Sequence, residues 1–413
     1  MKTEEIPEFG LLSGYRVILI GLSVAAPFAA ELYAENGADV IWIENPKVPD
    51  MGRFSCHAAS TQQDRRNMRS LALNYTKGPG KEAFLKLIET ADVLIEASVG
   101  GRFDKLGLSD AVLWERNPGL VIAHISGFGQ TGDPSYVKRA SYDPIAQAFS
   151  GAMRMQGMPG QPSTPAMPFP GDFTSSFYAF GMTVAALLKR TKTGVGESFD
   201  IAQFEAMVRL QSQYPNMYFS HGEDYVKEGA HSLSCARYGT YTCADGGEVY
   251  VLFLGPGVVK AGLPLIGLEP GSRLFPEGMG IIPYGSEAGD VAEAAFAEFL
   301  AAHTAEEVED ILANGGVPCS RIMDYEAMRT NSQYVARGVI QEWTAADGVT
   351  KVPGVKVVPE ASKYPGRVWR GAPCIGQDTD DILSELGFSV EDIEWMHETG
   401  VVNTLDFEHS FGK

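Results

Sequence analysis

The sequence predicts an α/β fold, with a large Rossmann-like domain built on a parallel sheet and a smaller α+β domain. Between residues 15 and 129, short apolar runs alternate with stretches of helical spacing. Near residue 225 the pattern changes to a hairpin followed by two helices. The chain has 413 residues, which is enough for two cores. These observations together favour a two-domain α/β protein.

The expected strands of the first domain are continuous apolar runs, as found in strands that are buried on both faces. These runs lie at residues 15–21, 39–45, 92–98 and 120–129. Helical spacing follows at 27–38 and 80–91, and Gly37 stands where the first helix should end. Repeated β-α-β units of this kind predict a parallel sheet wound with helices.

The smaller domain is predicted from a different pattern. Alternating apolar segments flank Gly246-Gly247, which indicates a hairpin over 238–255. Two helices follow, the second with Thr304 as N-cap and Glu307 three residues later. After about residue 355 the chain is rich in loops and ends in two amphipathic helices. We therefore assign 225–330 to the small domain, and 1–224 together with 331–413 to the large one.

Charge and cysteine content exclude several classes of partner. The chain carries 52 acidic and 33 basic residues, a net charge of −19, which repels nucleic acid and anionic lipid. The start lacks the layout of a signal peptide, and the first apolar run is interrupted by Pro27 and Glu31. Five scattered cysteines form no CxxC pair, so we expect no metal, no disulfide framework and a cytoplasmic location.

Common catalytic motifs are missing from the sequence. There is no GxSxG, no GxxxxGK[ST] and no HExxH, and the turn after the first strand has one glycine of a dinucleotide fingerprint. His124 lies inside an expected strand and is interpreted as a hydrogen-bonded core residue rather than a catalytic base.

Asp172 is the acidic residue whose context is unusual. A Pro/Gly-rich approach over 158–171 precedes it, and a helix-forming stretch follows. This places Asp172 at the N-cap, where the helix dipole would keep the carboxylate ionised. Two roles fit this position, a structural cap and a nucleophile. The local pattern leaves both open.

Five segments together resemble the class III CoA-transferases, the family of formyl-CoA, carnitine and bile-acid CoA-transferases. The resemblance spans nearly the whole chain in the family's order. The segments are "GYRVILIGLSVAAPFAAELYAENGADVIWIENP" at 14–46, "RRNMRSLALN" at 65–74, "SGFGQTGDPSYVKRASYDPIAQAFSG" at 126–151, "TGVGESFDIAQFEA" at 193–206 and "WRGAPCIGQDTDDILSELGF" at 369–388.

The resemblance implies that Asp172 is the catalytic nucleophile, which carries first an acyl group and then CoA. It implies coenzyme A and acyl-CoA as substrates, with no permanently bound cofactor, and a small carboxylic acid as the other substrate. It also implies an interlocked homodimer of ring-shaped chains. Gly255 and Gly257 are candidates for stabilising the oxyanion, although this loop departs from the family's glycine run.

Residues that hold CoA are also carried over from the family. They fall in the turn after the first strand, in the "RRN" segment, after "SVGG" and in "SYVKRAS". The candidates are Ser23, Val24, Arg69, Arg102, Lys105 and Lys138. Val99 and Leu106 stand where carnitine CoA-transferase has basic residues, and we expect Arg102 and Lys105 to substitute for them.

The substrate acid is predicted to be of the carnitine, crotonobetaine or γ-butyrobetaine type, with a bile acid as the alternative. Tyr214 and Tyr218 could face a trimethylammonium group, but their spacing is equally that of a packed helix, and core packing is the preferred interpretation. Two other functions remain alternatives. An α-methylacyl-CoA racemase would need a histidine where Tyr142 stands, and a non-catalytic CoA-binding protein would not need Asp172.

Overall fold

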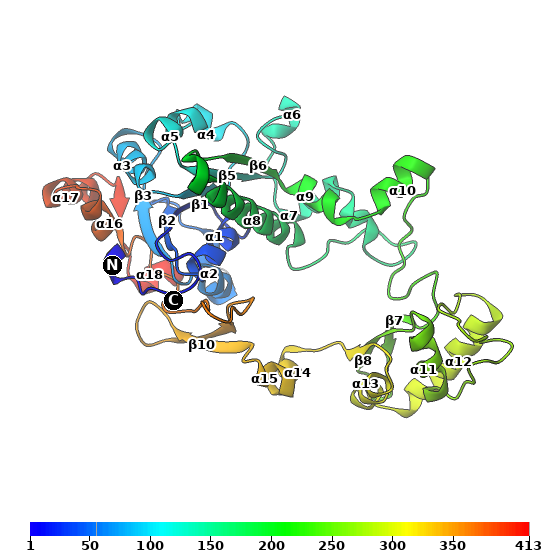
Figure 1. The fold of residues 1–413 in the computed structure, drawn as a ribbon. Helices are drawn as coiled ribbons and strands as arrows, with labels where there is room; N and C mark the ends of the chain where they lie inside the picture. The colour runs from blue at the N-terminus through cyan, green and yellow to red at the C-terminus, as the bar shows by residue number, and fades with distance from the viewer. Residues whose placement is uncertain (55, 413) are drawn as a thin grey trace. The chain divides into compact units, whose positions relative to one another are not determined.

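The computed structural model describes residues 1–54 and 56–412, which divide into two compact units (Figure 1). The first unit comprises 1–153, 165–220 and 335–413, and the second comprises 154–164 and 221–334. The sequence pattern places 154–164 in the large domain, whereas the structure assigns this segment to the smaller unit. Local contacts explain the difference, because Lys227 Nζ donates to the Gln161 carbonyl at 2.7 Å and Arg154 pairs with Asp224.

A mixed sheet forms the centre of the first unit. In the described part of the chain its strands run in the order β12-β3-β2-β1-β4-β5-β6, all parallel except β12. The strands are β1 (Arg16–Ile20), β2 (Asp39–Glu44), β3 (Arg69–Leu73), β4 (Val93–Glu96), β5 (Val121–Ser126), β6 (Ser198–Ala202) and β12 (Val402–Asn403). The predicted α/β class with a large parallel sheet is confirmed.

Helices cover both faces of this sheet (Figure 1). α1 (Ala25–Ala34) and α8 (Pro170–Thr193) pack on the face to which Val17 and Leu19 point. α3 (Gly78–Glu89) and α5 (Asp110–Arg116) cover the face of Ile18 and Ile20, together with α16 (Thr379–Glu385) and α17 (Val390–Glu398). Alternate strand residues point to opposite faces, so continuous apolar runs supply both cores.

Shorter α-helices and a strand pair also belong to the first unit, with α10 reaching its boundary with the second. They are α2 (Ala59–Asp64), α4 (Arg102–Lys105), α6 (Pro134–Val137), α7 (Asp143–Phe149), α9 (Gln203–Leu210), α10 (Tyr214–His221), α18 (Phe407–Phe411) and the β10–β11 pair (Ile340–Thr344 and Lys351–Val355). β3 and β6 have no counterpart among the expected strands. Their sequences, "RSLAL" and "SFDIA", contain polar residues that hide the apolar run.

The second unit has its own small sheet and core. β7 (Tyr238–Thr242) and β8 (Glu248–Leu252) form the predicted hairpin, and β9 (Cys319–Arg321) adds a third antiparallel strand. α11 (Pro256–Leu265), α12 (Glu287–Ala302) and α13 (Ala305–Asn314) pack around it. α14 (Tyr325–Thr330), which has no buried residue, and α15 (Ser332–Ala336) follow towards the boundary. The predicted capping box of Thr304 and Glu307 is present at the start of α13.

The strand order creates a switch point at β1, which pairs with β2 on one side and β4 on the other. Connections leave neighbouring strands in opposite directions at such a point, so a crevice opens at their carboxyl ends. The turn before α1 and the loop over 97–101 after β4 therefore meet at one edge of the sheet. We call this the carboxyl edge.

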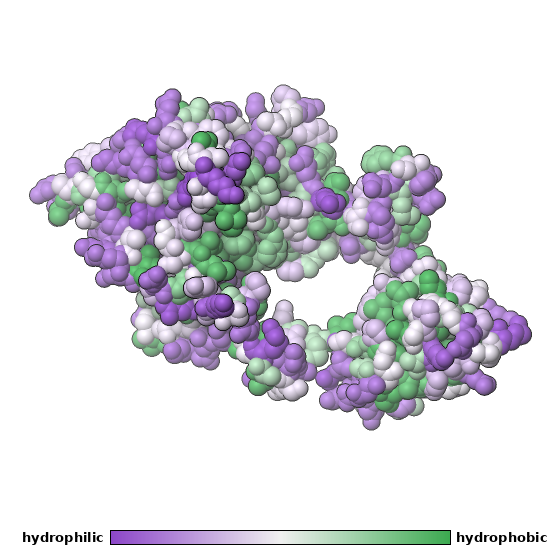
Figure 2. Space-filling view, viewed as in Figure 1, coloured by the Kyte–Doolittle hydropathy of each residue, from purple (hydrophilic) through white to green (hydrophobic). Residues whose placement is uncertain are grey.

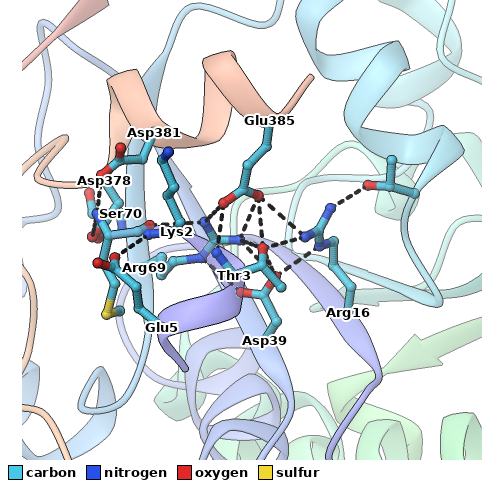
Figure 3. Close-up of polar contacts among 12 residues, drawn as sticks. Lys2, Thr3, Glu5, Arg16, Asp39, Arg69, Ser70, Asp378, Asp381 and Glu385 are labelled. Carbon is cyan, nitrogen blue, oxygen red and sulfur yellow. Dashed lines mark hydrogen bonds and ion pairs between the residues drawn. The ribbon is translucent and has the colours of Figure 1, made fainter. Parts of the chain in front are cut away.

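A buried ionic network occupies the opposite edge, where the strands begin (Figure 3). Arg69 donates to both carboxylate oxygens of Asp39, at 2.9 and 2.7 Å, and to Glu385 of α16 at 3.0 Å. Arg16 also donates to Asp39, at 2.8 Å, and Thr3 joins the cluster through its hydroxyl. The network therefore ties α16 to the amino ends of β1, β2 and β3.

The outer surface of the first unit carries an apolar patch. Figure 2 shows hydrophobic residues gathered over α1 and α8, where Phe177, Met182 and Leu188 are exposed. No helix in the described ranges is both long and apolar enough to cross a membrane.

Replacing Arg69 with Met should destabilise the protein by about 3 kcal/mol, because Asp39 and Glu385 would lose their shared partner in a buried network. Urea denaturation with matched m-values measures the loss. Arg116→Met is the control, because the exposed Arg116 pairs with Glu82 and Glu89 at the surface and should change stability by about 1 kcal/mol or less. Equal losses in the two variants would contradict this account.

Candidate active site

Asp172 lies in the first turn of α8, but it is not the N-cap. The helix begins at Pro170 and its N-cap is Phe169, so the predicted capping position is wrong by three residues. The orphan N–H groups of this turn are bound from outside the helix. Asp143 Oδ1 accepts the Gly171 N–H at 2.6 Å and the Asp172 N–H at 3.2 Å. Asp143 therefore does the capping that the sequence pattern assigns to Asp172.

Local sequence explains how Asp143 reaches α8. Asp143 is the first residue of α7, followed by Pro144, a pair that favours a helix start. Its carboxylate is buried and also accepts a hydrogen bond from Gln147 in the same helix. Gly171 is required for this approach, since a Cβ there would lie 2.9 Å from Asp143 Oδ1. Two helices thus meet through one buried carboxylate.

The charge of Asp172 is governed by these neighbours. Burial raises the pKa of its carboxyl, the negative charge of Asp143 raises it further, and a hydrogen bond from Gln203 lowers it. The net effect brings the Asp172 pKa to about 7. The expectation that the helix end keeps the group strongly ionised is therefore wrong, because Asp143 already occupies the N–H groups that would do so.

The start of α8 lies beside the turn that follows β1. Ser176, one turn after Asp172, donates its hydroxyl to the Ala25 carbonyl at 2.5 Å. Ser23 and Val24 immediately precede Ala25, so the structure brings these two predicted CoA contacts to the same edge as Asp172.

The turn at Ser23 is held in a left-handed conformation with φ of 62°. Asp50 accepts the Ser23 N–H at 3.1 Å, and Arg65 donates to the Ser23 carbonyl at 2.7 Å. Arg65 and Asp50 also pair with each other at 3.0 Å. The turn is therefore fixed before any ligand arrives.

The predicted basic CoA contacts lie on two short helices, α4 and α6, whose adjoining loops are neighbours. Arg102 and Lys105 form the exposed side of α4, directly after the loop that follows β4, and Lys138 is exposed at the end of α6. The Gly100 N–H donates to the Val137 carbonyl at 3.2 Å, which joins these loops. The structure thus gathers three basic residues at the carboxyl edge. The Leu106 side chain instead packs against the core.

Arg69 is the one predicted CoA contact that the structure places elsewhere. It is the first residue of β3, at the amino end of the strand, and it is fully buried. Its guanidinium donates hydrogen bonds to Asp39, Thr3 and Glu385. We correct this prediction, because the guanidinium lies at the edge of the sheet opposite the switch point and is already neutralised.

His124 is buried and has two acidic hydrogen-bond partners. This agrees with its interpretation as a hydrogen-bonded core residue. Its Nδ1 lies 2.6 Å from Glu96 and its Nε2 lies 2.9 Å from Asp110. Although burial lowers the His124 pKa, these two carboxylates raise it to about 10. The ring is therefore a cation at neutral pH and is unsuited to act as a base.

The remaining candidates lie on other elements. α10 contains no buried residue, and Tyr218 is exposed, so the preference for core packing of this stretch is wrong. Gly255 precedes α11 with φ of 99°, and Gly257 follows in its first turn. Both glycines belong to the second unit, and their role at the oxyanion stays a prediction.

Two residues of the site were not found from the sequence. Asp143 carried a weak signal, because an Asp-Pro pair marks a helix start. Gln203 carried none, since it lies 31 residues from Asp172 and contacts it only through the fold. A cavity of about 600 Å³ lies elsewhere in the first unit, lined by α2, β10–β11 and α18 residues such as Gln62, Trp343 and Phe407.

Comparisons with known proteins agree on one family. Residues 12–379 match the model of CoA-transferase family III. The chain is 35% identical over 408 residues to the bile acid CoA-transferase BaiK of Clostridium scindens, covering 98% of this chain and 92% of that protein.

Solved structures give the same fold. A CAIB/BAIF family protein from Brucella suis has a TM-score of 0.78 at 25% identity, covering 92% of this chain and 100% of that chain. Rv3272 from M. tuberculosis has a TM-score of 0.76 at 23% identity, covering 90% of this chain and 99% of that chain.

Asp172→Asn should stabilise the protein at pH 8, by no more than about 4 kcal/mol, the limit set by a pKa of about 7 against 3.8. Between these values the folded state holds a proton that the unfolded state releases, so the wild type loses stability as pH rises. The gain should therefore shrink towards pH 4. Thermal melts across this range measure it, with the exposed Asp104→Asn as control. A gain independent of pH would contradict the account.

Proposed function

This chain belongs to CoA-transferase family III, and on that premise we propose that Asp172 carries CoA between two carboxylic acids. The observation that carries the proposal is the carboxylate itself. It is 8% exposed, its pKa lies near neutrality, and it stands at the edge where the β1 turn and the basic loops meet. A carboxylate with a pKa of about 7 is substantially ionised at neutral pH and is a stronger nucleophile than an ordinary aspartate.

The proposed reaction begins at the donor thioester. An Asp172 oxygen attacks the thioester carbon and the C–S bond breaks. CoA thiolate departs, and a mixed anhydride of Asp172 and the donor acid is formed. The thiolate then attacks Asp172 Cγ and expels the donor acid, which forms an aspartyl-CoA thioester. The acceptor carboxylate reverses these two steps and departs as acceptor-CoA. Charge and atoms balance without a metal, an oxidant or water.

The CoA itself is proposed to lie across the carboxyl edge. Arg102, Lys105 and Lys138 would meet its phosphates, since they are exposed on short helices whose adjoining loops are neighbours. The turn at Ser23 and Val24 would contact the part of CoA nearer the thioester, because it adjoins the start of α8. The interlocked homodimer that the resemblance implies stays a prediction.

For the acid substrate, we rank a bile acid ahead of the carnitine-type acids that the sequence resemblance favours. The similarity to a bile acid CoA-transferase over nearly the whole chain supports this order. Exposed apolar side chains that neighbour Asp143 or Asp172 in sequence support it too. Ile145, Met167 and Phe169 are exposed and lie near Asp143 or Asp172 in the chain. A sterol skeleton would bury such side chains, with roughly 25 cal/mol gained per Å² of apolar area.

An α-methylacyl-CoA racemase is not supported. The phenol of Tyr142 stands where that activity needs a histidine, and His124 is held as a cation by two carboxylates. A two-base proton transfer therefore lacks its second base.

Incubation with an acyl-CoA and then borohydride should modify Asp172 in the wild type, because borohydride reduces an aspartyl thioester. Asp172→Ala should show neither the modification nor transfer of CoA to an acid. Peptide mass spectrometry locates the modified residue, and the melting curve shows whether the variant folds. Full transfer activity in Asp172→Ala would refute the nucleophile and leave a CoA-binding role.

A panel of acid acceptors with one acyl-CoA donor should rank the substrates. We expect kcat/KM for a bile acid to exceed that for carnitine, crotonobetaine and γ-butyrobetaine by at least about tenfold, since burying a sterol gains more than one aromatic contact with a trimethylammonium group. Transfer to betaines with bile acids ignored would restore the carnitine-type assignment.

A further inference from the structure

Gln203 makes the two oxygens of the Asp172 carboxylate unequal. It is the first residue of α9, directly after β6, and its side chain is buried. The Gln203 Nε2–H donates to Asp172 Oδ1. Within 1–54 and 56–412, no hydrogen bond is made to Asp172 Oδ2. One oxygen is thus held by an amide, and the other is free to react.

Resting on the proposed function, we propose that Gln203 is a catalytic residue that directs Oδ2 to attack and binds the negative charge that develops on Oδ1. The amide supplies a donor aimed at the aspartyl carbonyl itself. It would act in the steps in which Asp172 Cγ is attacked, and not in those in which the substrate carbonyl is attacked.

The electron balance decides when this donor is used. After Oδ2 attacks the donor thioester, Oδ1 becomes the carbonyl oxygen of the aspartyl half of the anhydride. When CoA thiolate attacks Cγ, the C=Oδ1 electron pair moves onto Oδ1, and its return expels the donor acid with Oδ2. The acceptor acid attacks Cγ in the same way, and CoA thiolate leaves. Oδ1 is therefore the oxyanion in both steps in which Asp172 Cγ is attacked, which we call the inner steps.

The geometry fits a preorganised donor rather than a mobile one. Gln203 is anchored where the β6–α9 junction packs beneath α8, and the Phe204 N–H donates to the Gly127 carbonyl at 3.4 Å. Met207, one turn later in α9, is buried against Gly171, the residue before Asp172. Donors fixed before the reaction avoid reorganisation, and removing one such donor lowers kcat by about 10²–10³-fold in a known case.

The steps in which a substrate carbonyl is attacked, which we call the outer steps, should respond differently to loss of the Gln203 amide. There the Gln203 hydrogen bond stabilises the free carboxylate, as the lowering of the Asp172 pKa by this contact indicates. Removing the donor makes the nucleophile more basic and does not remove an oxyanion donor from the substrate carbonyl. The first acyl transfer should therefore be retained while the inner steps slow.

Single-turnover experiments with an acyl-CoA test this on Gln203→Met and on the isosteric Gln203→Glu. Rapid quench and intact-protein mass spectrometry distinguish an adduct of acyl mass, the anhydride, from an adduct of CoA mass, the thioester. We expect formation of the CoA adduct, and kcat, to fall about 10²-fold, with the acyl adduct accumulating and KM for acyl-CoA lowered by that accumulation. Gln211→Met is the control, because its amide donates to the Ser150 carbonyl at 2.7 Å and not to Asp172.

The outcomes separate the two proposals. Absence of both adducts in the wild type refutes the proposed function. Adducts in the wild type, with unchanged kinetics in both folded Gln203 variants, refute the role of Gln203 alone. Equal slowing of both adducts, or the same loss in Gln211→Met, also refutes it, because a general structural effect would act on every step.

Discussion

The hydrogen bonds that the Asp143 carboxylate accepts from the first turn of α8 are the contact on which the rest of the site depends. They fix where α8 begins and therefore where Asp172 points. They also bring a negative charge to within reach of a second buried carboxylate, which raises the pKa of the Asp172 carboxyl. A single capping interaction thus sets both the position and the reactivity of the group. Gly171 permits it, because any side chain there would displace the Asp143 oxygen.

Asp172 is held between two opposing influences. Burial and Asp143 disfavour its charge, whereas the Gln203 amide favours it. A nucleophile needs both, since a strongly stabilised carboxylate attacks poorly and an unstabilised one remains protonated. The proposed use of Gln203 follows from the same arrangement. A donor that binds one oxygen of a carboxylate also binds that oxygen when it becomes the carbonyl of an ester-like intermediate.

The buried ionic network and the proposed active site lie at opposite edges of one sheet. The amino edge holds the Arg16, Asp39 and Arg69 network, with Glu385 joining it from α16. The carboxyl edge carries the loops that follow β1 and β4 at the switch point, and it is where the proposed reaction would take place. This division explains why Arg69, which the family resemblance predicted to contact CoA, is instead a buried member of the ionic network. Arg69 lies at the amino end of β3, and its side chain is therefore at the edge that holds the ionic network.

The sequence by itself determined the α/β class, the buried strands β1, β2, β4 and β5, the hairpin, the α13 capping box and the candidacy of Asp172. Each depends on periodicity or on residues a few positions apart. It also left the family resemblance to be tested by comparison. Only the tertiary structure decided that Asp143 caps α8, that Gln203 binds Asp172, and that Arg69 is neutralised. These contacts join residues about 30 positions apart in the chain, and one of them involves the polar strand β3. Sequence analysis could not find them, because side-chain periodicity carries no information about which distant residues meet in the fold.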